Sequence, residues 1–198
     1  MSKPLDYLIQ TSTESTAIRE RFLREQGEAL VQASKILGQC LARSGKVLIC
    51  GNGGSAADAQ HMAAEMVGRM LIERRALPAI ALTTDSSNLT ALANDYGYEF
   101  VFSRQVEALA RPADVLVAIS TSGNSPSVLR AAEAARRIGC TVISLTGGTG
   151  GKLAWLSTLN LNAAGGITSS RIQETHIFIV HSLVDLLDRF FLAEGGAE

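Results

Sequence analysis

One stretch of this chain combines residues that could bind an anion with residues that could move a proton. The sequence GNGGSAADAQHMAAE, residues 51–65, opens with three glycines and a serine and contains His61 and Glu65. Residues four apart on a helix share one face. An imidazole and a carboxylate on that face could bind one metal ion or act together as acid and base. A surface pair without chemistry remains the alternative from spacing alone.

The first five residues of that stretch, Gly51–Ser55, form what we call the glycine loop. They follow KVLIC, a short apolar run that indicates a buried strand. Glycines allow a tight turn and a close approach to a ligand, and the following helix N-terminus offers free N–H groups to an anion. We expect Ser55 to cap this helix, with Asp58 at the capping-box position.

A second loop, Ser120–Ser125, follows the apolar run DVLVAI and is called the serine loop. We expect Ser125 to be the N-cap of the next helix and Pro126 its first residue. Hydroxyl groups at a helix N-terminus can bind a phosphate without a lysine. Ligands in open α/β folds bind at the carboxyl ends of strands, so two such loops favour one phosphate site over two structural turns.

Gly51, Gly53 and Ala56 also match the G-x-G-x-x-A pattern of dinucleotide-binding proteins. That pattern expects an acidic residue about 20 positions later, at the end of the next strand. The nearest such acid, Asp85, comes only after a long helix, and this interpretation leaves the serine loop unused. A P-loop is excluded because no GK[ST] follows the glycines.

Further candidate ligands lie near the C-terminus, where residues 169–192 are predicted to form a largely buried helix. Gln173 and His181 are eight residues apart, about 80° around and 12 Å along a helix. Their side chains could meet only when extended, or from helices of two protomers. His176 lies about 140° from His181, so both are not expected in one site. A core role for each histidine stays open.

These residues must be positioned by alternating strands and helices, which predict an α/β fold with a parallel sheet and helices on both faces. Residues 4–44 are predicted to form two amphipathic helices, which either drive oligomerisation or cover a sheet face. We predict one domain over 1–198, with an N-terminal extension (1–44) and an α/β core (45–192). The predicted strands are 46–50, 77–82, 114–120, 141–147 and 159–163. The predicted helices are 55–73, 87–109, 125–138, 151–157 and 169–192.

Composition narrows the class of protein. The 198 residues are 46% apolar and 19% charged, as in ordinary globular proteins, and the net charge of −1 gives no sign of nucleic-acid binding. No apolar run approaches the roughly 18 residues of a membrane span, and we expect no signal peptide. The three cysteines lack CxxC spacing, which favours reduced thiols and a cytoplasmic location.

Four segments together carry a family resemblance: CGNGGSAADAQHMAAE, ALTTDSSNLTALANDYGYE, VFSRQVEALARPADVLVAISTSGNSPSV and RIQETHIFIVH. They closely resemble the phosphoheptose (sedoheptulose 7-phosphate) isomerases of the sugar isomerase (SIS) domain superfamily. The resemblance runs from about Gly45 to His181. It implies a flavodoxin-like three-layer fold and a homotetramer with active sites at subunit interfaces. It also implies an aldose–ketose isomerisation through an enediol, the first step of ADP- or GDP-heptose synthesis for lipopolysaccharide.

The resemblance also implies roles for individual residues. It implies one zinc per subunit, with the acid–base pair Glu65 and His181. The implied zinc ligands are His61, Glu65, Gln173 and His181. The implied substrate contacts are Asn52, Gly53, Gly54, Ser55, Glu65, Asn94, Asp95, Ser120, Thr121, Ser122, Ser125 and Gln173. A carboxylate and an imidazole suit this reaction, because one carbon-bound proton must move to the neighbouring carbon. Whether Glu65 is ligand, base or both by turns stays open.

Two departures from the family pattern lie near the last helix. Ser170 stands where many members have Ala or Asp, and LNLNAAGGITSS replaces a more usual strand and loop. An alternative function is that of non-catalytic relatives that scaffold the bacterial replication initiator protein. We expect those to lack the helix glutamate, so Glu65 and His181 favour the enzyme. A sugar-phosphate-sensing regulator would add a DNA-binding domain, for which this chain has no room.

Overall fold

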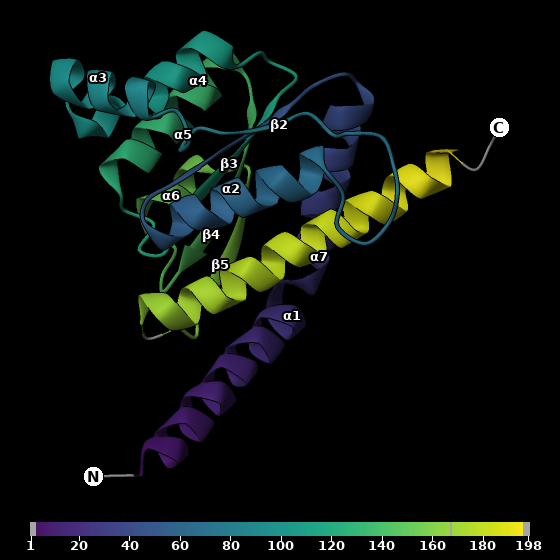
Figure 1. The fold of residues 1–198 in the computed structure, drawn as a ribbon, viewed down its shortest axis with the longest axis vertical. Coiled ribbons are helices and arrows are strands. Elements are labelled where there is room, and N and C mark those ends of the chain that lie inside the picture. The colour runs from purple at the N-terminus through teal and green to yellow at the C-terminus, as the bar shows by residue number, and fades with distance from the viewer. Residues whose placement is uncertain (1–2, 167, 196–198) are drawn as a thin grey trace.

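The computed structural model describes residues 3–166 and 168–195. Its centre is a five-stranded parallel sheet in the order β2-β1-β3-β4-β5, as expected for a flavodoxin-like fold (Figure 1). The strands are β1 (Val47–Gly51), β2 (Ala79–Ala81), β3 (Val115–Ser120), β4 (Thr141–Gly147) and β5 (Leu159–Ala163). All five predicted strands are therefore confirmed. β1 and β3 are buried along their whole length, which explains why their sequences are continuously apolar rather than alternating.

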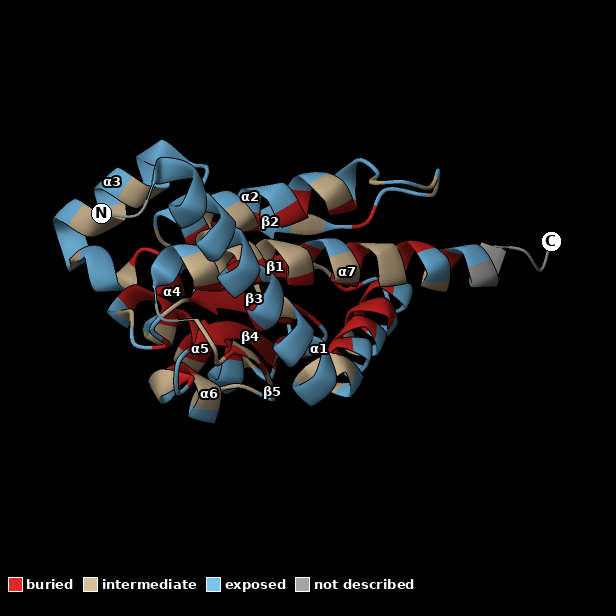
Figure 2. Cartoon of the chain, turned by 90° about the horizontal axis from the view of Figure 1, so that it is seen from below, coloured by how far each residue is buried: buried red, intermediate tan, exposed pale blue. Residues whose placement is uncertain are grey.

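Helices cover both faces of this sheet, as the sequence predicted. Alternate residues of β1 enter different cores: Val47 and Ile49 face one, and Leu48 and Cys50 face the other. The first core is closed by α1 (Pro4–Ala42), α2 (Gly54–Val67) and α7 (Ser169–Gly195). The second is closed mainly by α4 (Ser103–Leu109), α5 (Pro126–Ile138) and α6 (Gly151–Leu156). Figure 2 shows the buried sheet between these two layers.

The predicted pair of N-terminal helices is wrong. α1 is one continuous helix of 39 residues, Pro4–Ala42, which ends where Ser44 adopts a positive φ of 61°. Gly27 has open space around it, and a single glycine costs a helix only about 1 kcal/mol, too little to force a turn. The second half of α1 packs into the core through Leu30 and Leu37, whereas its first half projects from the body (Figure 1).

Glycine breaks the helix that was predicted over 87–109. The structure has α3 (Ser86–Tyr96), a 3₁₀ turn η1 (Tyr98–Phe100) and then α4. Gly97, at φ +95°, occupies a conformation that other residues rarely adopt, and it turns the chain sharply between α3 and η1. α2 also ends earlier than predicted, at Val67 rather than residue 73. The remaining predicted helices match α5, α6 and α7 within a few residues.

α7 lies between α1 and α2 and packs against both (Figure 1). It therefore brings the predicted C-terminal ligands next to the helix that follows the glycine loop. α7 ends at Gly195, and residues 196–198 lie outside the described residues. None of the helices in the described part of the chain is long and apolar enough to cross a membrane.

Candidate active site

The glycine loop connects β1 to α2 with a backbone that requires glycine. Gly53 has φ +56° and is itself the N-cap of α2, so the predicted cap at Ser55 is wrong. The N-cap therefore lies two residues earlier than predicted, and Ser55 is buried in the first turn of the helix. A Cβ on Gly51 would lie 2.7 Å from the Ser55 carbonyl oxygen, so the strand end and the helix start are in close contact. Asp58 consequently has no capping role.

The serine loop is held by its own hydroxyl groups and by a neighbouring glycine turn. Ser125 is the N-cap of α5 as predicted, but its hydroxyl lies 3.0 Å from that of Ser120 instead of capping the helix. Gly123, at φ +63°, packs so tightly that a Cβ would lie 2.0 Å from the Gly150 carbonyl oxygen. Ser122 is exposed and Thr121 is half-buried, so the loop presents hydroxyl groups at the surface.

The two loops lie side by side, as expected for neighbouring parallel strands. β1 pairs with β3, with Gly51 opposite Ile119 at the ends of the strands. The Asn52 amide donates to the Ser127 hydroxyl over 2.9 Å, which joins the glycine loop to the first turn of α5. Two helix N-termini therefore open at the same edge of the sheet, where an anion would be stabilised by both.

His61, Glu65 and His181, which we call the histidine group, meet where α2 passes α7. The Nε2 atoms of His61 and His181 are 3.0 Å apart. Glu65 Oε1 lies 3.3 Å from His61 Nε2. The His61 and Glu65 side chains are 43% and 24% exposed, so a ligand could reach them. One protomer alone brings these three side chains together.

Gln173 reaches the site from the first turns of α7. Its side chain lies so close to Gly54 that a Cβ there would be 2.4 Å from the amide nitrogen. It lines a surface cavity of about 480 Å³ together with His61 and Ser170. Within the described chain, neither Glu65 nor His181 lines that cavity. His61 is therefore the residue shared by the cavity and the histidine group.

The donor atoms of this region fit zinc in chemistry and in spacing. Ligands at about 2.0–2.1 Å from a tetrahedral zinc ion are about 3.3 Å from one another. The 3.0 Å and 3.3 Å separations at His61 Nε2 are close to that value. Among the residues described, no three His, Cys, Asp or Glu side chains form a complete metal site. The contacts at His61 thus supply two edges of such a site, and Gln173 lines the same cavity as His61.

Arg74, which the sequence analysis did not single out, holds the end of α2 in place. Its guanidinium donates to the carbonyl oxygens of Glu65, Met66 and Gly68, and over 2.7 Å to Asp188 on α7. The Arg74 and Asp188 side chains are almost completely buried. This ion pair therefore fixes the helix end that carries Glu65 against the helix that carries His181. Only the exposed carbonyls of a helix C-terminus could have suggested such a partner.

Three of the other candidates, His176, Asn94 and Asp95, lie outside the histidine group. His176 is completely buried and its Nε2 lies 2.9 Å from the Thr146 carbonyl oxygen, which confirms that it does not share a site with His181. Burial lowers the pKa of His176 to about 4, so it stays neutral. Asn94 and Asp95 are exposed on α3, where the Asn94 amide donates to the Asp95 carboxylate. In the described residues, no hydrogen bond joins either to another element.

Asp58 stands between the glycine loop and His61. Its Oδ2 atom is buried without a hydrogen-bond partner among the described residues. Burial raises the pKa of this carboxyl group to about 6, although nearby His61 opposes the shift. The side chain lines the same cavity as Gln173. A carboxyl group that ionises near neutrality therefore borders the candidate site.

Comparisons with known proteins agree with this fold and these loops. A family model described as the SIS domain matches residues 12–147. The phosphoheptose isomerase of Desulfovibrio desulfuricans is 52% identical over 193 residues, covering 98% of this chain and 91% of that protein. The solved phosphoheptose isomerase from Neisseria gonorrhoeae superposes with a TM-score of 0.88 at 46% identity, covering 94% of this chain and all of that one.

A second solved phosphoheptose isomerase, from Francisella tularensis, has a TM-score of 0.90 at 38% identity and covers 95% of this chain. The five-stranded parallel sheet and the match to the SIS domain model together place the chain in the class of SIS-domain proteins. Within that class, the chain belongs to the phosphoheptose isomerase family.

Proposed function

We propose that this chain isomerises sedoheptulose 7-phosphate to D-glycero-D-manno-heptose 7-phosphate, the first step of ADP- or GDP-heptose synthesis for lipopolysaccharide. The observation that carries the proposal is the histidine group, in which His61 and Glu65 lie on the helix that begins at the glycine loop and His181 lies on α7. His61 lies seven residues after Gly54, about 10 Å along α2. A seven-carbon sugar phosphate could extend between the two sites. The family relationship supports the same substrate.

The loops would bind the phosphate and the sugar hydroxyl groups. We assign the phosphate to Ser120, Thr121, Ser122 and Ser125, which surround the N-terminus of α5. Asn52, Gly53, Gly54 and Ser55 would contact the sugar, and we assign the exposed side chains of Asn94 and Asp95 to it as well. Hydroxyl donors and the free N–H groups of a helix N-terminus can bind a phosphate dianion without a cationic side chain, because each donates a hydrogen bond to a phosphate oxygen.

Glu65 and His181 would move the protons. Glu65 would take the proton from C1 of the ketose, while a proton is delivered to the C2 oxygen, to give the cis-enediol. The same carboxyl group would then return its proton to C2 as the C1 hydroxyl proton leaves, which forms the aldehyde. His181 would exchange the oxygen-bound protons, because an imidazole can donate and accept near neutral pH.

We further propose one zinc ion per subunit, held by His61, Glu65, Gln173 and His181. When bound, it would polarise the carbonyl group and stabilise negative charge on the enediol oxygens. Elemental analysis of protein purified without chelator tests this directly. A molar ratio near one zinc per chain supports the assignment, and metal-free protein that retains full turnover with chelator present refutes it.

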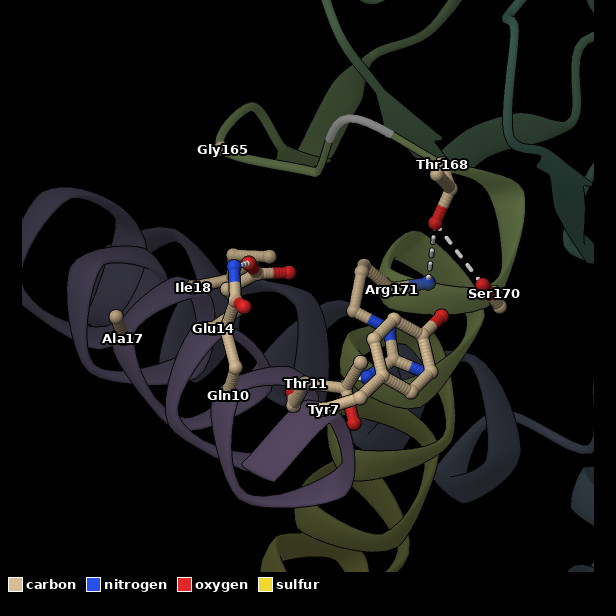
Figure 3. Close-up of a pocket in the computed structure, with 10 residues that line it drawn as sticks. All are labelled: Tyr7, Gln10, Thr11, Glu14, Ala17, Ile18, Gly165, Thr168, Ser170 and Arg171. Atoms are coloured by element: carbon tan, nitrogen blue, oxygen red, sulfur yellow. Dashed lines mark hydrogen bonds between the residues drawn. The ribbon is translucent and has the colours of Figure 1, made fainter. Parts of the chain in front are cut away.

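We propose that the protein assembles as a homotetramer through α1. The projecting half of α1 exposes the apolar side chains of Leu5, Leu8 and Ile9. Exposed apolar surface of this kind is typical of a protein–protein interface. A cavity of about 420 Å³ lies beside it, between α1 and the start of α7, and its lining includes Tyr7 and Arg171 (Figure 3). The mass in solution by light scattering tests the tetramer. Leu8→Glu should shift that mass towards smaller species.

A cytoplasmic location is proposed as well, supported by the three free, buried cysteines of a chain without disulfides in its described part.

A turnover assay tests the activity itself. Purified protein is supplied with sedoheptulose 7-phosphate, with and without added zinc, and the aldose product is measured. Turnover supports the enzyme. Inactivity with zinc present refutes it and leaves the non-catalytic scaffold, which binding to the bacterial replication initiator protein would then test.

A further inference from the structure

A hydrogen-bonded bridge crosses the candidate substrate site, and its outer member is Tyr98. The Tyr98 hydroxyl donates to Asn52 Oδ1 over 2.9 Å. On its other side, Asn52 Nδ2 donates to the Ser127 hydroxyl over 2.9 Å. The bridge therefore runs from η1 through the glycine loop to the first turn of α5, and Tyr98 joins segments 46 residues apart.

The chain around Tyr98 is built to hold its side chain there. Gly97, at φ +95°, ends α3 and turns η1 back towards the sheet edge. Glu99 forms an ion pair with Arg130 of α5 at 3.6 Å. The Arg130 guanidinium also lies 5.4 Å from the centre of the Phe100 ring. The two residues that follow Tyr98 are thus attached to α5, while the Tyr98 hydroxyl reaches the glycine loop.

The hydrogen-bonding capacity of Asn52 shows what the bridge achieves. A primary amide has one acceptor oxygen and two N–H donors. Tyr98 uses the oxygen and Ser127 uses one N–H, which fixes the plane and the orientation of the amide. Among the described hydrogen bonds, the second N–H has no protein partner and remains for a ligand. Without Tyr98, the amide could rotate about its last torsion angle.

We propose that Tyr98 is a positioning residue that orients the Asn52 amide for the sugar phosphate and locks the glycine loop to α5. This rests on the proposed function, because Asn52 is assigned there as a substrate contact. The bridge lies among the groups that bind the substrate, away from the histidine group that would move protons. Its loss should therefore weaken binding and leave the chemical step unchanged.

The test is Tyr98→Phe, which removes only the hydroxyl, with Tyr96→Phe as the matched control. Tyr96 is similarly exposed, and its ring packs near Arg104. We expect Tyr98→Phe to raise KM about threefold to tenfold, as for one lost hydrogen bond. Its kcat and thermal midpoint should stay unchanged, and Tyr96→Phe should match the wild type. An unchanged KM, or an equal change in Tyr96→Phe, overturns the proposal.

A double-mutant cycle with Ser127→Ala adds a second measurement. If both residues act through Asn52, losing either bond frees the amide, and the combined variant should raise KM by less than the product of the single effects. If the KM increase of the double variant equals the product of the two single increases, the proposal that Tyr98 and Ser127 act through one Asn52 amide is overturned. Calorimetric binding of sedoheptulose 7-phosphate is measured alongside. A wild type that binds without turnover refutes the proposed function, and the affinity ratio of Tyr98→Phe to wild type then decides the bridge.

Discussion

The serine loop and the histidine group are held in place by different means. The serine loop continues a buried strand, closes through its own hydroxyl contact and is packed against the Gly150 backbone. The histidine group lies on two helices rather than at the end of a strand, and its geometry depends on how α2 and α7 pack and on the buried Arg74–Asp188 pair. Substitutions in the first should therefore change stability and binding, whereas those in the second should change chemistry.

The largest effect is expected from Glu65→Gln. Loss of a positioned acid–base group typically lowers a rate 10²–10⁴-fold, and we expect kcat to fall in about that range while the thermal midpoint is retained. Glu73→Gln is the control, since that side chain is 84% exposed on the segment after α2. Steady-state kinetics measures both. Full activity in Glu65→Gln would remove the carboxylate from the proposed proton path.

Gly123→Ala should lower the stability of the protein by distorting the serine loop. A Cβ there would collide with the Gly150 backbone and also require an unfavourable positive φ, so we expect a loss of about 2–5 kcal/mol in the free energy of unfolding. Gly148→Ala separates the two causes, because Gly148 has φ +56° with open space around it. Urea unfolding measures both. Equal losses would mean that the contact with Gly150 contributes nothing.

The pH dependence of the free energy of unfolding should separate the contribution of His176 in the core from that of Asp58 beside the candidate site. Burial lowers the pKa of His176 from 6.5 to about 4. Between these pH values the unfolded chain binds a proton on this residue and the folded protein does not. Its contribution is complete above about pH 6.5 and is lost as the pH falls towards 4, on the order of 3 kcal/mol. Asp58, with its pKa raised to about 6, acts in the opposite direction over the same acidic range.

Chemical unfolding between pH 7 and pH 4 measures this balance. His176→Asn should flatten the loss of stability on acidification, and Asp58→Asn should steepen it. If His176→Asn leaves the slope unchanged, the buried histidine does not titrate as described.

The smallest effect is expected from Ser122→Ala. Ser122 is exposed on the serine loop, and its hydroxyl accepts only from the Asn124 backbone among the described contacts. Losing one hydroxyl donor to a phosphate should raise KM about tenfold with kcat retained. Ser87→Ala on α3 supplies an exposed control. A fall in kcat without a change in KM would place this hydroxyl with the histidine group instead.

The fold could be predicted closely because its signals are local. Five short apolar runs gave five strands, and the residues that end β1 and β3 gave both loops. The errors lie where local signals are weak. Gly27 lies within the segment predicted as two helices, yet α1 continues through it without a break. Gly97, in contrast, divides a segment that was predicted as one helix. Ser55 is a good capping residue, but contact between β1 and α2 moved the helix start to Gly54.

The candidate site divides in the same way. The strand-end loops could be located from local residue patterns, because a parallel sheet places consecutive carboxyl ends at one edge. The same patterns placed His61 and Glu65 on one helical face, because that spacing follows from 3.6 residues per turn. The contacts of His181 with His61, of Gln173 with Gly54 and of Tyr98 with Asn52 became visible only in the folded chain. These contacts join residues 46 to 120 positions apart, and only packing sets such distances.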